Sequence, residues 1–65
     1  MTYLIKEETN MFTPTRVITK AKVIEYYACN SEQEVWDYCR NKTKELKGTY
    51  DEDKIDKVFY YEELN

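Results

Sequence analysis

The chain has 65 residues and a formal net charge of −3, with ten basic residues and thirteen acids. This length allows one small domain, residues 1–65, and excludes a two-domain enzyme or a doubly wound cofactor fold. The sequence has no histidine, and its single glycine cannot form a phosphate-binding loop, so the commonest catalytic and phosphate-binding motifs are excluded. The excess of acids also argues against a general nucleic-acid-binding protein.

Apolar content is low for a folded domain. Leu, Ile, Val and Phe together supply 13 residues, which is near the limit below which chains stay disordered. Seven tyrosines and one tryptophan add large amphipathic side chains. We therefore expect either a modestly stable monomer or a subunit that completes its core by association.

The first predicted element is a strand over Tyr3–Glu8, because its first residues are β-formers. Residues 9–15 follow, and they are polar apart from Met11 and Phe12. Pro14 lacks a backbone donor and favours an extended geometry in the residue before it. This stretch is predicted to be a loop.

The strongest strand signal covers Arg16–Cys29. Its apolar or small side chains alternate with charged ones, but the alternation shifts by one residue near the middle. Such a shift indicates a β-bulge in a long, bent strand, and the alternative is a strand buried on both faces in an oligomer. The alternating set is Val17, Thr19, Ala21 and Val23 before the shift and Ile24, Tyr26 and Ala28 after it.

A helix is predicted to begin at Asn30 or Ser31. The run Ser31-Glu32-Gln33-Glu34 has the form of a capping box, in which the serine oxygen accepts a free backbone N–H and Glu34 reaches back. Gly48 is expected to end the helix in the left-handed conformation. The predicted buried stripe consists of Val35, Trp36, Cys39, Thr43 and Leu46.

Residues 49–54 are predicted to be an acidic loop, followed by a strand over Ile55–Glu63. A second helix is the alternative for this last segment. Asp51, Asp53 and Asp56 offer the oxygen ligands that calcium prefers, but the glycine turn and terminal glutamate of a calcium loop are missing. We expect a solvated turn with no metal and no cofactor.

These elements predict an α+β fold of the form β-β-α-β. With a hairpin between the first two strands and a right-handed crossover, the third strand pairs beside the first, giving an antiparallel sheet of order 2-1-3. One helix covers one face of this sheet. The other face is left open, and tyrosines on it would form a docking surface for a partner or a second copy.

The two cysteines, Cys29 and Cys39, match neither a zinc nor a CxxC pattern. We expect two reduced, buried thiols, with a disulfide between them as the alternative. The sequence shows no apolar run long enough to cross a bilayer and no secretion signal, so we expect a cytoplasmic protein that does not bind membranes.

The chain resembles the small acidic single-domain proteins carried by phages and mobile elements of low-GC bacteria. The resemblance is carried by the AT-rich residue usage, the short chain starting at Met1, the β-β-α-β plan and the Ser31–Glu34 helix start after a tyrosine-rich strand. Members of this class, anti-CRISPR proteins among them, often inhibit host defence or host enzymes stoichiometrically. The resemblance implies an inhibitor of a host protein in a bacterial cytoplasm, and it assigns no functional residue.

From the residues, we predict a protein-binding inhibitor or modulator and no enzyme, since so small a domain leaves little room for a catalytic cleft. Aromatic and apolar side chains would anchor the partner, and carboxylates would steer it. The expected partner is a host protein with a basic nucleic-acid-binding groove. The predicted partner-binding residues are Met11, Phe12, Asp51, Glu52, Asp53, Tyr60, Tyr61, Glu62 and Glu63.

Two alternatives remain for the function. The first is a structural subunit that forms a homodimer or higher oligomer through the open sheet face or a strand edge. The second is direct nucleic-acid binding through Arg16, Lys20 and Lys22, with bases stacked on tyrosines. We do not expect the second, because residues 1–30 carry only one more base than acids. The stacking tyrosines would be Tyr26, Tyr27, Tyr60 and Tyr61.

Overall fold

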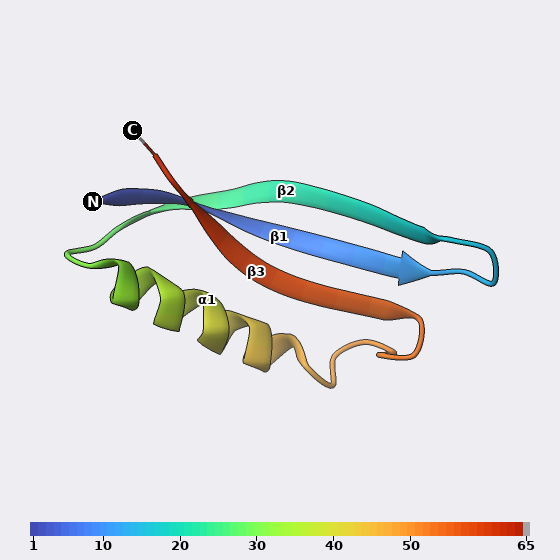
Figure 1. Cartoon of the computed structure of the whole chain (residues 1–65). Coiled ribbons are helices and arrows are strands. Elements are labelled where there is room, and N and C mark those ends of the chain that lie inside the picture. The colour runs from blue at the N-terminus through green and yellow to red at the C-terminus, as the bar shows by residue number, and fades with distance from the viewer. Residues whose placement is uncertain (65) are drawn as a thin grey trace.

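The computed structural model describes residues 1–64, which form three strands and one helix (Figure 1). In chain order these are β1 (Thr2–Phe12), β2 (Val17–Ala28), α1 (Glu32–Leu46) and β3 (Ile55–Glu63). Both neighbours of β1 run antiparallel to it, and the sheet has the order β2-β1-β3. The predicted α+β class and strand order are confirmed, and the last segment is a strand rather than a helix.

The first strand is longer than predicted. It continues through Asn10, Met11 and Phe12, which sequence patterning assigned to a loop, and the hairpin connection is confined to residues 13–16. The prediction was wrong here because β1 is the central strand. Asn10 pairs with Thr19 of β2 and with Asp56 of β3, so pairing on both sides overrides the weak local preference.

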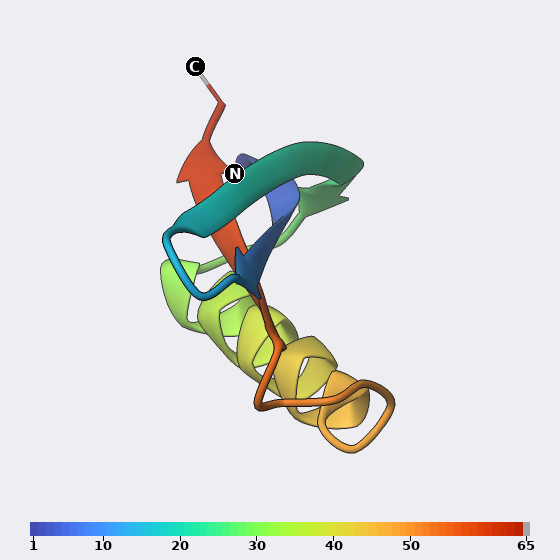
Figure 2. The ribbon, with the colours of Figure 1, turned by 90° about the vertical axis from the view of Figure 1, so that its right-hand side faces the viewer.

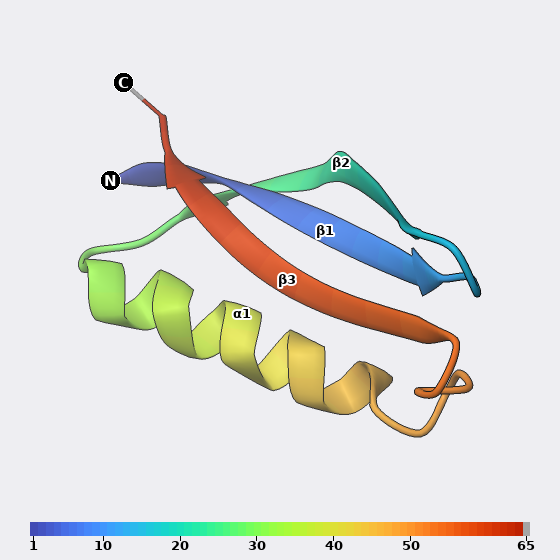
Figure 3. The ribbon, with the colours of Figure 1, turned by 45° about the vertical axis from the view of Figure 1, so that its right-hand side comes forward.

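The predicted bulge in β2 is confirmed. Ile5 pairs with Glu25 and the next residue, Lys6, pairs with Val23, which leaves Ile24 as the extra residue. A bulge bends its strand and increases the local twist. β2 bends accordingly along its length (Figure 3).

Helix α1 follows the sequence signals with one difference at its start. Ser31 is the N-cap residue, but its side chain makes no capping hydrogen bond. Glu34 does reach back, but its carboxylate accepts the N–H of Asn30 at 3.2 Å, one residue before the Ser31 N–H that a capping box uses. At the other end, Gly48 has φ +87°, a left-handed conformation that β-carbon-bearing residues rarely adopt.

The core lies between α1 and the β1–β3 half of the sheet (Figure 2). Within the described chain its buried members are Tyr3, Ile5, Val35, Cys39 and Phe59. Both cysteines are free, and Cys29 is partly buried. The predicted helix stripe was wrong at one residue, because Trp36 is 45% exposed and lies outside this core.

Alternation along the strands gives the sheet two distinct faces. Tyr3, Ile5 and Phe59 point to the helix. The odd-numbered residues of β1 and β3 therefore form the covered face, together with the β2 residues that pair with odd-numbered residues of β1. The opposite, open face carries Leu4, Lys6, Glu8, Asn10 and Phe12 of β1, Val17, Thr19, Ala21, Val23, Tyr26 and Ala28 of β2, and Asp56, Val58, Tyr60 and Glu62 of β3.

Candidate interaction surface

Exposed apolar side chains gather on the open face, along β2 and the end of β1. Phe12, Val17, Val23 and Tyr26 all belong to this face, and they are between 44% and 68% exposed. Beside Val23, Ile24 is the extra residue of the bulge and is also exposed. We call these five residues the open-face row. Large exposed apolar side chains on one side of a small domain are typical of an interaction surface.

The β2 part of the open face carries no charge. Between Val17 and Ala28 its members are aliphatic, aromatic, small or hydroxyl side chains. Charges on this face lie on β1 and β3, where Lys6 and Glu62 form an ion pair of 2.8 Å. The hydrogen bond that the Lys6 ammonium donates to the Glu62 carboxylate is the main reason that the pKa of Lys6 is raised, and the charge of Glu62 adds to it. An uncharged strip therefore borders a polar one, as in the centre and rim of many interfaces.

Five of the predicted partner-binding residues meet at the hairpin end of the sheet. The N–H of Phe12 donates to the carbonyl of Lys54 at 2.7 Å, which ties the end of β1 to the acidic loop. Met11 and Phe12 therefore lie close to the loop that carries Asp51, Glu52 and Asp53, all three exposed.

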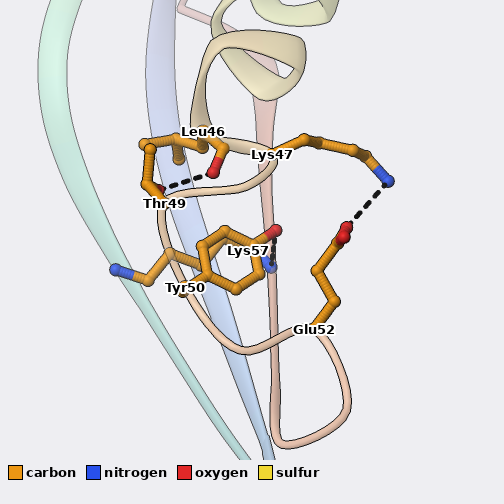
Figure 4. A network of polar contacts seen from close by, with 6 residues as sticks. All are labelled: Leu46, Lys47, Thr49, Tyr50, Glu52 and Lys57. Carbon is orange, nitrogen blue, oxygen red and sulfur yellow. Dashed lines mark hydrogen bonds and ion pairs between the residues drawn. The ribbon is translucent and has the colours of Figure 1, made fainter.

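Side-chain contacts order this loop (Figure 4). The Thr49 hydroxyl donates to the carbonyl of Leu46 at 2.5 Å, and Lys47 pairs with Glu52 at 3.8 Å. The Asp51 carboxylate accepts the N–H of Asp53 at 3.1 Å. The three acids thus sit on a defined turn beside an exposed phenylalanine, an arrangement able to steer a basic partner towards an apolar contact.

The other four predicted residues lie at the opposite end of β3, about 15–25 Å along the strand from the acidic loop. Tyr60 and Glu62 belong to the open face, while Tyr61 and Glu63 belong to the covered face. Tyr61 packs edge-on against Tyr3 at 5.4 Å, and its hydroxyl donates to Glu32 at 2.9 Å. This hydrogen bond is the main reason that the pKa of Tyr61 is raised. The structure therefore splits the predicted site into two ends.

The tyrosine platform considered for base stacking is likewise divided. Tyr26 and Tyr60 lie on the open face, but Tyr27 and Tyr61 lie on the covered face, because neighbours in a strand point to opposite sides. Tyr27 stacks on Tyr38 of the helix at 4.3 Å. The four tyrosines cannot form one stacking surface.

The basic residues of β2 form a hollow on the part of the covered face that the helix does not reach. Lys20 and Lys22 line it together with Lys57 of β3, and Glu7 lies among them. Its volume is about 470 Å³. One carboxylate among three lysines reduces its attraction for a phosphate backbone.

The two edges of the sheet differ. On β3, the N–H of Phe59 donates to the Thr43 hydroxyl at 3.0 Å and that of Lys57 to the Tyr50 hydroxyl at 3.2 Å. Both amides therefore point away from β1, and side chains from the helix and the loop satisfy them. On β2 the stretch before the bulge is exposed at Val17 and from Thr19 to Val23, and Ile18 is partly buried. An open edge beside an uncharged apolar face favours contact with another chain.

Sequence reasoning missed most of the open-face row. As partner-binding residues it named Phe12 but not Val17, Val23, Ile24 or Tyr26, although their alternation in β2 was recognised and Tyr26 was considered for base stacking. The missing signal was spatial: the core contacts show which face the helix covers, and the pairing register shows which residues share the other face. The bulge had already indicated that Val23 and Tyr26 share a face.

Within residues 1–64, no group of three or more His, Cys, Asp or Glu side chains is placed to hold a metal ion. Across the same residues, the helix is too short and too polar to span a bilayer. No protein-family model matches this chain, and comparison with curated proteins and with solved structures yields no match.

Proposed function

We propose that this protein acts by contact, as a stoichiometric inhibitor or modulator of another protein. The observation that carries the proposal is the open-face row. Its apolar side chains are exposed, and most of them lie on β2, which has no charged residue on the open face. Aromatic anchors surrounded by polar residues supply most of the energy of protein interfaces. Tyr26 and Phe12 are the anchors of this surface.

The partner that fits this surface has an apolar patch next to a basic one. The acidic turn at Asp51–Asp53 adjoins Phe12 and would steer a basic groove, such as that of a nucleic-acid-binding enzyme, towards the open face. In line with the class that the sequence resembles, we place the protein in the cytoplasm of a bacterial host, encoded by a phage or mobile element and acting on a host protein.

The experiment is affinity capture followed by titration. The wild-type chain and the Tyr26→Glu and Val23→Glu variants are used as bait in a low-GC bacterial lysate, and the captured protein is identified and purified. Its activity is then titrated with the wild-type chain. We expect inhibition that is complete at a fixed molar ratio and lost with both variants.

Inhibition that becomes complete with time when the chain is present below that molar ratio would contradict the proposal, because one molecule of the chain would then inactivate several molecules of the captured protein. Capture that is unaffected by both glutamate variants would remove the open face from the site. Lys20→Glu is the matched control, because it places the same charge on the opposite face of the same strand. Retained capture by this variant shows that a glutamate in β2 is tolerated.

A second candidate function is a homo-oligomeric structural subunit. The same open-face row favours it, because a second copy related by a two-fold axis would bury the row on both chains. Light scattering separates the two functions: a species of 7.9 kDa at working concentration supports a monomeric inhibitor. A species of twice that mass that is lost in Val23→Glu supports the subunit.

A further inference from the structure

A second surface lies along the outer edge of β3, where α1 and the strand enclose a groove of about 380 Å³. Its floor is apolar, since Cys39 and Phe59 belong to the core. A volume of this size lies at the lower end of ligand sites and accepts one or two side chains. The groove is lined by Trp36, Cys39, Arg40, Thr43 and Lys44 of the helix and by Val58, Phe59, Tyr60 and Tyr61 of the strand.

Trp36 is the unusual member of this lining. Helical spacing places it in the apolar stripe, yet it is 45% exposed at the mouth of the groove. The guanidinium carbon of Arg40 lies 5.3 Å from the centre of its ring, within cation–π range. Trp and Arg are among the side chains that most often dominate binding energy. In this chain Trp36 and Arg40 already contact each other in the absence of a partner.

The charge of the groove is opposite to that of the whole molecule. Arg40 and Lys44 line it, and none of its described lining residues carries a carboxylate. The chain as a whole has thirteen acids and a net charge of −3. The groove therefore favours an occupant with negative charge, although the molecule as a whole is acidic.

The strand edge itself is closed to an added strand along part of this groove. The outward amide of Phe59 already donates to Thr43, and the amide of Lys57 donates to Tyr50. Strand addition needs such amides as its hydrogen-bond donors. An occupant beside Phe59 must therefore enter by its side chains.

We infer that this groove binds a linear segment of a partner protein in which a bulky apolar side chain is flanked by carboxylates. The apolar side chain fills the hollow beside Trp36, and the carboxylates pair with Arg40 and Lys44. This site is distinct from the open-face row and remains if that surface serves another purpose. It gives the molecule two contact surfaces of different chemistry.

The test uses the only tryptophan in the sequence as its reporter. An acetylated, amidated peptide Glu-Asp-Leu-Phe-Asp-Glu is titrated into the protein, and Trp36 emission and backbone amide shifts are followed together. We expect a saturable change in emission and amide shifts confined to the groove. The Arg40→Gln/Lys44→Gln variant should bind at least about tenfold more weakly.

The matched control is Lys20→Gln/Lys22→Gln, which loses the same charge on β2 away from the groove. It should bind within about twofold of wild type, because distant exposed charges contribute little. Two further peptides separate the two contributions: one has lysines in place of the acids, the other alanines in place of Leu and Phe. Both should fail to saturate.

The inference is overturned if emission does not saturate by about 1 mM peptide, a concentration that detects even weak binding. It is also overturned if the Arg40/Lys44 variant binds as wild type does, or if the amide shifts fall on β2. It is overturned as well if Trp36 emission and the groove amide shifts change with protein concentration alone, because a second copy would then fill the groove. None of these outcomes affects the capture experiment with Tyr26→Glu and Val23→Glu, so the two proposals fail separately.

Discussion

Ile5 illustrates how much a single residue contributes in a core this small. Its side chain is fully buried against Val35 and Phe59 in a cluster of few members. A domain of this length is stabilised by only about 3 to 10 kcal/mol. We expect Ile5→Val to lower the free energy of unfolding by about 0.5 to 1.5 kcal/mol and Ile5→Ala by about 2 to 5 kcal/mol, in urea titrations followed by circular dichroism.

The control for Ile5 is the same pair of changes at Ile24, which is 36% exposed at the bulge. Its variants should change the stability by less than about 1 kcal/mol. Equal losses at both positions would show that the core is not where the fold places it.

Tyr38 provides a pH-dependent contribution. Its hydroxyl donates to Glu25, and this hydrogen bond, with burial, raises the pKa of Tyr38 to about 12 from its ordinary value of 10.0. The folded state thus holds the phenol proton more tightly than the unfolded chain. This stabilisation is complete below pH 10 and is lost as the pH rises towards 12.

We expect Tyr38→Phe to keep the stacking on Tyr27 but to lose about 1 to 2 kcal/mol of stability at pH 7. Its stability should also fall less steeply than that of wild type between pH 10 and pH 12, although Tyr3 and Tyr61 still contribute because their pKa values are raised too. Parallel urea titrations across this range measure the difference. Tyr26→Phe, at a mostly exposed position, is the control and should follow wild type.

At the level of elements, Thr43 joins the helix to the edge of β3. Its hydroxyl donates to the carbonyl of Cys39 at 2.8 Å and accepts the N–H of Phe59 at 3.0 Å. Thr43→Val keeps the shape but leaves that amide without its acceptor, which costs about 1 to 3 kcal/mol. Hydrogen exchange at Phe59 should become faster in this variant. Thr43→Ser keeps the hydroxyl and should restore slow exchange; exchange that is unchanged in Thr43→Val would rule out the contact.

Sequence patterning predicted the elements that depend on local chemistry. The helix start at Ser31, its end at Gly48 and the bulge in β2 all follow from neighbouring residues, and the structure confirms each of them. The failures depend on tertiary context. The end of β1 is a strand because two partners pair with it, and Trp36 is exposed because the helix lies at the β3 side of the sheet.

The candidate surface was less predictable for the same reason. An uncovered sheet face follows from having one helix, but which residues occupy it depends on register. Of the nine predicted partner-binding residues, Phe12 belongs to the open-face row, Tyr60 and Glu62 lie elsewhere on the open face, and Tyr61 packs against the core. The loop acids were assigned from charge, and their closeness to Phe12 appears only through the contact between Phe12 and Lys54.

For the molecule as a whole, surface area points to incomplete burial. The accessible area is 4719 Å², somewhat above the roughly 4,400 Å² typical of a monomer of 7.9 kDa. The excess is consistent with the bare stretch of β2. Since the open-face row is apolar, we expect the net charge of −3 to oppose the association of separate copies at neutral pH.

That balance predicts association as the pH approaches the isoelectric point of about 4.9. As the net charge falls to zero, repulsion between copies is lost while the apolar attraction remains. We expect the scattering mass to rise from near 7.9 kDa at pH 7 to larger values at pH 5. A Val23→Thr/Tyr26→Thr variant, which has the same charge and comparable strand preference, should stay small. If this variant associates as strongly as wild type, the surface through which copies associate lies elsewhere. A Trp36→Gln variant would then test the groove at Trp36.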